Sequence, residues 1–554
     1  MNLKSPSSRD SKVANQLTLF LLATSPIFIL PWINFDPVNV PRLTLVSTFG
    51  FAGLYLFSKA YCFTGGSDKS SKHRFLFLSS LLLILSTLST WFFADFDFAR
   101  QLYGAFGRNN GVLATIGLLG IFLLASMADQ AGKGKYFGLS IYIGGLANLI
   151  YGWIQYFSLD PVNWQNQYGP IVGAFGNPNF MSAFLAFFAI FLMSRIVYNT
   201  NSSVTVIFTW IGLFVFDVLL ILATKSIQGI FVVVIGLLIL SILRFKIYSR
   251  MRLFSLTLVV GLALGSVVVL GMLGRGFLGS ILYQSTLEVR LYFWSAALQM
   301  LLASPLFGLG MDSFGTWYRM FRSEKAISAG DITADSAHNV LLDFGAWGGV
   351  PLLTSLLIIG IFVLFQAIKF IYSKAEIDRD FAFLFAAWIG FLAQAQVSIN
   401  QLGLAIYGAL LSGLLLSRII GFSAIKKTAF HKLRFNFGVF VSLILGFLVA
   451  LPLFLSDVGF RDALERRNSK FLIEKVERWP RNDVYLLMAS NLLKNSGLDL
   501  QSVELAREAI AVNPNNVSAL LFLYQSQEIS SNERARIKEK IIQLDPWIEG
   551  KRLK

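Results

Sequence analysis

The sequence predicts an all-α protein: a polytopic transmembrane helical bundle of about thirteen spans, followed by a small α-helical repeat domain. Of its 554 residues, 55% are hydrophobic and only 14% are charged, which is too apolar for a soluble protein of several domains. Apolar runs recur as far as residue 456, and the chain is polar beyond it. These observations divide the chain into a membrane domain, 1–456, and a C-terminal helical domain, 457–554.

The spans are predicted from apolar runs of roughly 18 to 25 residues, which can cross a hydrocarbon core of about 30 Å. The first run follows Lys4, Arg9 and Lys12 and lacks a small-residue cleavage site after it, so we expect it to remain as a span. The runs lie near residues 14–33, 41–62, 75–94, 110–128, 136–157, 180–198, 203–223, 226–243, 252–273, 347–370, 381–397, 402–420 and 434–456.

The distribution of Lys and Arg predicts the orientation of these spans. One set of alternate loops, starting with the N-terminus, holds Lys4, Arg9, Lys12, Lys59, Lys69, Lys72, Arg74, Lys133, Lys135, Arg195, Arg244, Lys246, Arg250, Arg252, Lys369, Lys374, Arg379, Arg418, Lys426, Lys427, Lys432 and Arg434. The short loops on the other side hold Arg42, Arg100, Arg108 and Lys225. The positive-inside rule therefore predicts a cytoplasmic N-terminus in a bacterial cytoplasmic (inner) membrane. The net charge of +16 reflects this topology and does not call for nucleic acid as a partner.

This topology places two polar regions outside the cytoplasm: the long segment of about 275–346 and the C-terminal domain. His338 is then extracytoplasmic, whereas His73 and His431 lie in basic cytoplasmic loops. Cys62 is the only cysteine, which excludes an internal disulfide and any metal site built from several cysteines.

The C-terminal domain contains a repeat in which Pro closes each unit, with a spacing of about 34 residues. The repeated segments are WPRND (479–483), NPNN (513–516) and DPW (545–547). With small residues such as Ala506, Ala509 and Ala519 where paired helices approach, residues 460–550 resemble tetratricopeptide repeats. Such a stack either binds an extended protein partner in its groove or forms a helical cap without a ligand.

Polar motifs gather at the outer ends of the predicted spans. They are GAFGRNNG (104–111), GAFGNPNF (173–180), TKSIQG (224–229), LEVRLYFW (287–294) and DSAHN (335–339). Polar and ionisable groups at membrane level are costly unless they are paired or face water, so a belt of them on one face predicts a functional site.

The order of these motifs resembles that of the O-antigen ligase and polymerase superfamily over most of residues 100–420. The resemblance rests on GNPNF before a span, Arg290 four residues before Trp294, the segment SPLFGLGMDSF (304–314), and AHN before a glycine-rich span entry. It implies a metal-independent membrane glycosyltransferase without a cofactor, which moves a glycan from a polyprenyl (undecaprenyl) pyrophosphate to an acceptor hydroxyl outside the cytoplasm. Some members carry a C-terminal tetratricopeptide region.

Three cations are candidates for binding the donor pyrophosphate, which needs positive charge as the leaving group forms. Arg290 comes first, because its planar fork suits phosphate. The alternatives are an interfacial anchor or a partner of Glu288. Arg108, in a glycine-flanked loop, is the second, unless it is a plain loop cation. The chain departs from the family's Ser-Arg-Gly with Ser226, Ile227, Gln228 and Gly229, which leaves Lys225 to supply the charge.

His338 is the candidate catalytic residue, a role that the family resemblance also implies. We expect Ser336 to cap a helix whose first residues include His338, so that the helix dipole keeps the imidazole neutral. A neutral imidazole can accept the proton of an attacking hydroxyl. The alternative is a histidine that packs at a junction between a loop and a helix, and Asp335 is the nearest substitute base.

Four amide side chains are candidate contacts to glycan or acceptor: Asn177, Asn179, Asn339 and Gln396. Asn177 and Asn179 flank Pro178 and would also form a turn, and Gln396 would also cap a span.

Other functions remain open on the sequence. A lipid or polysaccharide transporter would show charges or broken helices near the membrane midplane, often in two related halves. A scaffold that displays the repeats would leave the outer motifs without a purpose. Within the enzyme class, the donor chemistry serves a ligase, a polymerase, a wall-polymer transferase and a protein O-oligosaccharyltransferase equally. The partners are a lipid-linked donor and a glycan, lipid or protein acceptor.

Overall fold

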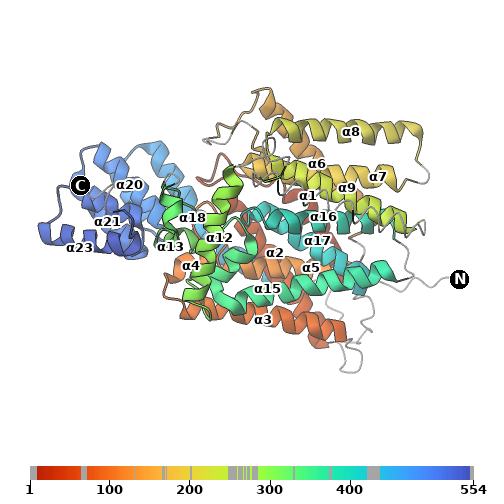
Figure 1. Cartoon of the computed structure of the whole chain (residues 1–554), viewed down its shortest axis with the longest axis horizontal. Coiled ribbons are helices and arrows are strands. Elements are labelled where there is room, and N and C mark those ends of the chain that lie inside the picture. Colours follow the sequence, from red (N-terminus) through yellow and green to blue (C-terminus); the bar gives the residue numbers. More distant parts are fainter. Residues whose placement is uncertain are drawn as a thin grey trace.

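The fold is known from a computed structural model, which describes residues 9–63, 71–129, 131–164, 171–199, 202–247, 285–328, 331–373, 377–420 and 437–548, together with residues 169, 259, 266, 270, 275 and 276. Within these residues all regular structure is helical, and the predicted fold class, an all-α polytopic membrane protein, is confirmed (Figure 1). The predicted span at 252–273 lies outside the described residues apart from three isolated positions.

Nine helices of the described chain are long and apolar enough to cross a membrane. They are α2 (Asn39–Phe63), α3 (Ser71–Phe93), α6 (Gly134–Tyr156), α7 (Pro178–Val197), α8 (Val204–Ala223), α9 (Ile227–Ile247), α15 (Val340–Tyr372), α17 (Leu402–Ile420) and α18 (Phe437–Arg466). Three further predicted runs form shorter helices: α1 (Arg9–Thr24), α5 (Val112–Ser126) and α16 (Arg379–Ala395). The first run therefore gives a shorter helix than expected, since α1 ends before Pro26.

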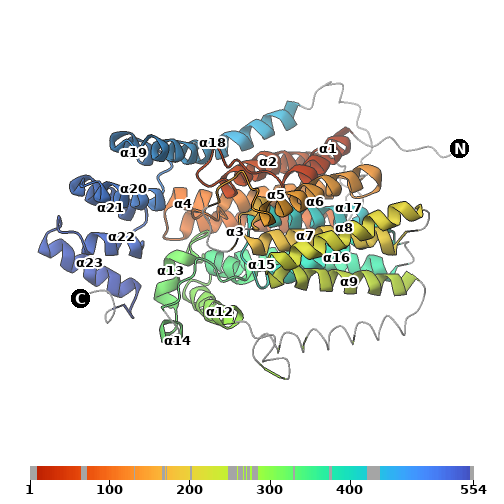
Figure 2. The ribbon, with the colours of Figure 1, turned by 90° about the horizontal axis from the view of Figure 1, so that it is seen from above.

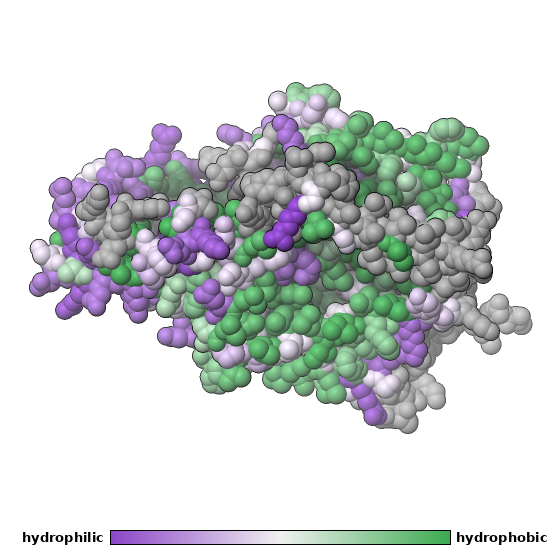
Figure 3. Space-filling model, in the orientation of Figure 1, coloured by the Kyte–Doolittle hydropathy of each residue, from purple (hydrophilic) through white to green (hydrophobic). Residues whose placement is uncertain are grey.

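The centre of the bundle depends on close contact between α2 and α5. A Cβ added at Gly120 would lie 2.0 Å from the carbonyl oxygen of Gly50, and one added at Gly53 would lie 2.0 Å from that of Gly120. Only glycine allows two helix backbones to approach this closely, as is common between transmembrane helices. On the face shown in Figure 3, the described surface of the bundle is largely hydrophobic, whereas that of the C-terminal region is largely hydrophilic.

Helix α15 is interrupted at Gly348 and Gly349, where the backbone angles are not helical. A Cβ added at Gly349 would lie 2.4 Å from the carbonyl oxygen of Pro305, so the segment of the SPLFGLG motif packs directly on the break. The break lies where the sequence predicts the tenth span to begin, and residues before it form a short helix that leads into the span.

The C-terminal region contains α19 (Ser469–Val476), α20 (Asp483–Asn495), α21 (Asp499–Val512), α22 (Val517–Tyr524) and α23 (Ser531–Leu544). We call these the C-terminal helices. They lie at the same end of the bundle as α4 (Phe98–Tyr103), α12 (Ser285–Ala303) and α13 (Phe314–Phe321), an end that we call the polar end (Figures 1 and 2). Helix α18 leads from the bundle into them without interruption, so the expected boundary at residue 456 falls inside a helix.

Candidate functional site

The DSAHN motif forms a turn directly before α15, and here the structure corrects the sequence analysis. The helix begins at Val340, and its N-cap is Asn339, whose side chain accepts a hydrogen bond from the Leu342 amide at 3.1 Å. His338 is therefore not a helical residue. Its φ of 53° lies in the left-handed region, which a non-glycine residue adopts only when its surroundings hold it there.

Asp343 holds this turn, a role that the sequence pattern did not predict. One carboxylate oxygen accepts a hydrogen bond from the Ser336 hydroxyl at 2.6 Å, and the other accepts one from the Ala337 amide at 2.7 Å. The Ser336 hydroxyl in turn accepts the His338 amide at 2.9 Å. Asp343 is 1% exposed. An acidic residue in the first turn of an apolar helix was the available signal.

The imidazole of His338 presents one nitrogen for chemistry. Its Nδ1 lies 3.2 Å from the carbonyl oxygen of Ser336, which can only accept, so we assign the proton to Nδ1 and the free lone pair to Nε2. The ring packs on Phe293 of α12, with the centroids 5.4 Å apart. This geometry suits a group that takes a proton at Nε2.

The pKa of His338 is lowered to about 4, first by burial and then by the positive charge of Arg108, with Arg290 acting in the same direction. The hydrogen bond to Ser336 and the charge of Asp335 oppose this shift. The neutral imidazole expected from the sequence agrees with this direction, but the expected cause was wrong, because His338 precedes the helix. Burial and two arginines replace the helix dipole as the explanation.

Arg108 is presented by the GAFGRNNG loop, which Asp312 holds in place. One Asp312 carboxylate oxygen accepts hydrogen bonds from the backbone amides of Ala105, at 2.8 Å, and Asn110, at 2.9 Å. A Cβ on Gly104 would lie 2.6 Å from the same oxygen, which explains the glycine that opens the motif. Two motifs far apart in the sequence, GAFGRNNG and SPLFGLGMDSF, thus form one structure.

Arg108 reaches the His338 turn through Asp335. Its Nε donates to one carboxylate oxygen at 3.2 Å, and a terminal nitrogen donates to the other. The Arg108 side chain is 10% exposed, whereas that of Asp335 is 66% exposed. The second terminal nitrogen of Arg108 is buried and has no hydrogen-bond partner within the described chain. The Arg108 guanidinium therefore binds the carboxylate of Asp335 at the surface, and one of its terminal nitrogens is left to bind a further acceptor.

Arg290 lies on α12, which crosses the direction of α15 at the polar end (Figure 1). Its side chain is half-buried, and it forms no hydrogen bond or ion pair with any residue that the structure describes. The side chain of Glu288, its alternative partner, lies outside the described residues. Arg290 lies one helical turn before Phe293, the ring on which His338 packs, and its charge lowers the pKa of His338.

Asn339 and Gln396 also belong to this cluster. The Asn339 amide donates to the backbone oxygen of Gln396 at 3.1 Å, and the same loop carries Asn400, whose backbone oxygen accepts from the Asn110 side chain at 2.7 Å. The loop between α16 and α17 therefore connects the His338 turn with the Arg108 loop. We call Arg108, Arg290, Asp335, His338, Asn339 and Gln396 the His338 cluster.

The other three candidates form a separate group. Asn177 caps α7 by accepting the Asn179 amide at 2.9 Å, as a turn former should, and Asn179 accepts the Ser226 hydroxyl at 2.8 Å. Lys225, the neighbour of Ser226, is exposed and has a φ of 57°. Between residues that the structure describes, no hydrogen bond or ion pair joins this group to the His338 cluster.

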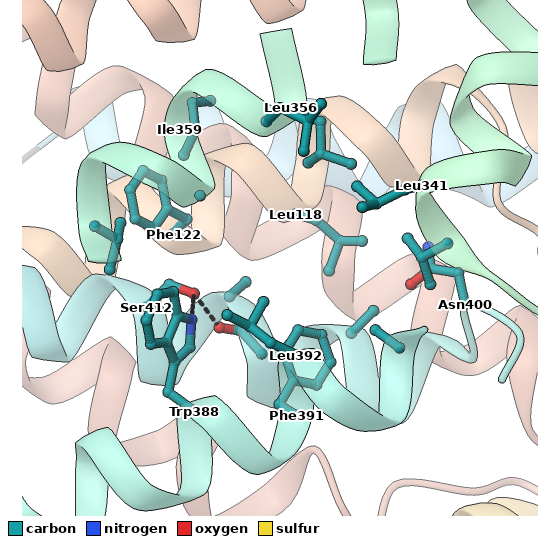
Figure 4. Close-up of a pocket in the computed structure, with 18 of the residues that line it drawn as sticks. Leu118, Phe122, Leu341, Leu356, Ile359, Trp388, Phe391, Leu392, Asn400 and Ser412 are labelled. Atoms are coloured by element: carbon teal, nitrogen blue, oxygen red, sulfur yellow. Dashed lines mark hydrogen bonds between the residues drawn. The ribbon is translucent and has the colours of Figure 1, made fainter. Parts of the chain in front are cut away.

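An apolar cavity of about 550 Å³ runs within the bundle beside the His338 cluster. Figure 4 shows Asn400 at one side of it and, at the other, Trp388, whose indole donates to Ser412 at 2.8 Å. Leu118, Leu341, Leu356 and Phe122 line the space between them. Gln396 and Val340, next to Asn339, also belong to its wall, so the cavity approaches the turn that carries His338.

Comparison with known proteins adds one match. Residues 188–357 match a family model described as O-antigen ligase. The match begins in α7, ends in α15 and includes Arg290 and His338, but not the Arg108 loop or the C-terminal helices. Among curated proteins, none matches the chain.

Proposed function

We propose, from the premise that the chain belongs to the O-antigen ligase superfamily, that it transfers a glycan from a polyprenyl pyrophosphate carrier to an acceptor hydroxyl. We place the reaction at the outer face of the bacterial cytoplasmic membrane, and the excess of Lys and Arg in the loops at the opposite end of the spans supports this orientation. A membrane glycosyltransferase of the O-antigen ligase type is the broader statement that the family match supports.

The observation that carries this proposal is the apolar cavity, whose wall includes Val340, Gln396 and Asn400. Gln396 and Asn400 are hydrogen-bonded to Asn339, beside His338, and to Asn110 of the Arg108 loop. Pockets for small ligands commonly have volumes of about 300 to 1,000 Å³, so a cavity of about 550 Å³ can hold part of an isoprenoid chain. A lipid bound there would carry its head group toward Asn339, where Arg108 and Arg290 supply positive charge. A lipid with an anionic head group fits this arrangement better than a free sugar nucleotide does.

The chemistry follows from these positions. The acceptor hydroxyl attacks the anomeric carbon, and its proton passes to Nε2 of His338. The bond between the anomeric carbon and the pyrophosphate oxygen breaks, and the pyrophosphate leaves with the electron pair. Arg108 and Arg290 stabilise its negative charge. Asp335 occupies the Arg108 fork until the pyrophosphate, which carries more negative charge, displaces it.

The break in α15 argues against a transporter. In transporters, broken helices leave backbone groups free to bind a substrate or ion. Here these groups are bonded within the protein: the carbonyl oxygens of Ala346 and Trp347 accept the amides of Leu309 and Gly310, each at 3.0 Å, and the Val350 amide donates to Pro305 at 2.8 Å. The break therefore anchors the SPLFGLG segment.

The proposal is tested with the purified protein in lipid nanodiscs, a polyprenyl pyrophosphate-linked glycan as donor, and separate acceptors. A lipid-linked core sugar, a second donor molecule, a wall polymer and a hydroxyl-bearing peptide represent the acceptor classes. We expect release of polyprenyl pyrophosphate together with one glycosylated acceptor, and no transfer from a nucleotide sugar. Release from none of the four mixtures, or transfer from the nucleotide sugar, would contradict the proposal.

A cavity variant sharpens this test. Leu118→Trp fills the cavity and should raise the KM for the polyprenyl donor while a donor with a short isoprenoid chain is less affected. Leu85→Trp is the matched control, because Leu85 is 55% exposed on the outside of α3. Equal KM values for the two variants would remove the cavity from the donor site.

A further inference from the structure

The repeated C-terminal motifs hold the residues that dock the C-terminal helices on the bundle. Asp483, the last residue of WPRND, binds Arg100 of α4 at 2.9 Å. The side chains of Asn513 and Asn516, both from NPNN, donate to the same Asp483 oxygen at 2.8 Å each. Asp545, from DPW, binds the bundle at a second place. The motifs thus do more than end helices.

Asp545 makes the most enclosed of these contacts. It is 0% exposed, and its two oxygens bind one terminal nitrogen of Arg322 at 2.9 Å each, while Arg319 binds at 2.9 Å. The Arg322 side chain is 1% exposed. A buried carboxylate with two arginines is stable because its charge is paired. Without Asp545, Arg319 would lose its ion-pair partner and Arg322 would keep only Asp331.

Arg322 also binds the segment that leads to the His338 turn. Its other terminal nitrogen binds Asp331 at 2.7 Å and the Ile332 carbonyl oxygen at 3.3 Å. These residues precede Asp335, the partner of Arg108, by only a few positions. One guanidinium therefore joins the C-terminal helices to the segment that carries the His338 cluster.

A second path runs through α13 itself. Arg319 lies on this helix, and Tyr318 beside it is buried and contacts Phe293, with the ring centroids 5.5 Å apart. Phe293 is the ring on which His338 packs. Displacement of α13 would consequently change the packing of the imidazole.

The Arg108 loop has its own contact with the C-terminal helices. Phe106, two residues before Arg108, packs edge-on against Tyr485 of α20 at 5.2 Å, and Phe35 stacks on Phe106 at 5.8 Å. Tyr485 is in turn held by a hydrogen bond to Asp457 of α18. Both sides of the Arg108–Asp335 pair are thus attached to the same group of helices.

We propose that the C-terminal helices position the two loops that form the His338 cluster, and that Asp545 is the positioning residue for the loop that carries Asp335 and His338. The effect on catalysis rests on the proposed function, whereas the effect on the loop does not. Asp545 lies outside the reacting atoms and acts through Arg319 and Arg322.

The test uses Asp545→Asn in the full-length protein. The amide keeps the shape of the side chain but removes its charge. Hydrogen exchange of residues 331–338 should become about tenfold faster, because both arginines lose the charge of Asp545 and Arg322 no longer joins Asp331 to the C-terminal helices, while α20 and α21 stay protected. Glu533→Gln is the matched control, since Glu533 pairs with Arg507 inside the C-terminal helices on a partly exposed surface.

A second variant covers the case in which Asp545→Asn unfolds the C-terminal helices. Arg319→Gln changes the bundle side only and leaves Arg322 on Asp545, so a smaller acceleration in the same segment, about threefold, is expected. Asp545→Glu retains the charge and should restore most of the protection. Unchanged exchange of 331–338 in both Asp545→Asn and Arg319→Gln would overturn the proposal.

Transfer kinetics separate positioning from folding. His338 is faced by Arg108, Arg290 and Asp335. If Asp545→Asn lets the His338 turn move away from Arg108 and into water, the pKa of His338 rises and the acid limb of the transfer rate moves to higher pH. Glu533→Gln should leave the limb in place. Faster exchange without any transfer in the wild type would contradict the proposed function alone, whereas normal transfer and an unmoved limb despite faster exchange would overturn the positioning role.

Discussion

Two pairs of arginine and aspartate lie at opposite ends of the bundle, and they differ in exposure. At the end away from the C-terminal helices, Arg195 and Asp380 lie 2.8 Å apart with side chains that are 5% and 7% exposed. At the polar end, the Arg108 side chain is 10% exposed, but that of Asp335 is 66% exposed. Both side chains of the Arg195–Asp380 pair are shielded from solvent. In the Arg108–Asp335 pair the carboxylate is exposed, so an incoming anion can replace it.

The surroundings of the two pairs agree with this difference. Asp380 also accepts the Gly134 amide at 2.9 Å and so connects α16 with the start of α6. Asp335 lies three residues before His338, whose pKa is lowered by burial, by Arg108 and by the half-buried Arg290. A buried ion pair does not by itself indicate a binding site. An arginine whose partner is exposed, beside further cationic and basic groups, does indicate one.

The largest effect among the arginine variants is expected for Arg290, which has no partner within the described chain. Arg290→Ala should lower transfer by about 10² to 10³, the range seen when one group that stabilises a developing anion is removed. Arg290→Lys should restore only part of it, since the charge remains but the fork is lost. Equal rates for the Lys variant and the wild type would count against bidentate phosphate binding.

Comparison of Arg108→Gln with Arg195→Gln tests the contrast itself. Arg108→Gln should slow transfer about tenfold or more with little loss of stability, because Asp335 is exposed and becomes solvated. Arg195→Gln removes the nearest charge partner of the buried Asp380 and leaves it only the more exposed Arg379 at 3.7 Å, so this variant should destabilise the protein by about 3–5 kcal/mol, with normal transfer per folded molecule. Thermal unfolding and transfer rates, measured on the same samples of both variants, show whether each substitution lowers stability or transfer. Equal loss of stability in both variants would contradict the view that Arg195–Asp380 is a structural pair and Arg108–Asp335 a binding pair.

The dependence of the transfer rate on pH should change moderately in Arg108→Gln, and the direction of the change can be predicted. A base works while it is neutral, so transfer should fall only as the pH drops through about 4, the pKa of His338. Arg108→Gln removes a charge that lowers this pKa, and the limb should move to higher pH. A limb that moves to lower pH in this variant would mean that Arg108 does not act on the titrating group.

Lys225 should have the smallest effect. It is exposed and belongs to the group around Asn179 and Ser226, which no described contact joins to the His338 cluster. Lys225→Ala is therefore expected to change the KM for the donor by less than about threefold. A rise of KM comparable to that of Arg290→Lys would bring the TKSIQG motif into the donor site after all.

Features that depend on neighbouring residues in the sequence could be predicted, whereas features that depend on contacts between distant residues could not. Apolar runs depend on local composition, and they predict the helices well. The cap of α15 is also local, but Ser336 and Asn339 compete for the role, and Asn339 takes it because Asp343 engages the Ser336 hydroxyl. The sequence pattern did not reveal which of the two would win.

Long-range contacts were beyond the reach of the sequence pattern. The motifs predicted that Arg108, Arg290 and His338 share one face and offered Asp335 as a substitute base, but they did not predict that Asp312 and Asp335 both bind the Arg108 loop. Neither aspartate has a local sequence signal that names its partner. The assignment of His338 as the base remains a prediction that the geometry supports.

That assignment is tested most directly by single-turnover transfer with purified His338→Ala and His338→Gln proteins. General-base assistance is worth about 10² to 10⁴ in rate, so both variants should lose this much at normal abundance in the membrane. His73→Ala is the control. His73 lies at the start of α3, away from the polar end that holds His338, so this variant should transfer glycan at the wild-type rate. Glutamine can hydrogen-bond but cannot take a proton at neutral pH. Near-native transfer by His338→Gln would contradict the account and make His338 a hydrogen-bonding residue only.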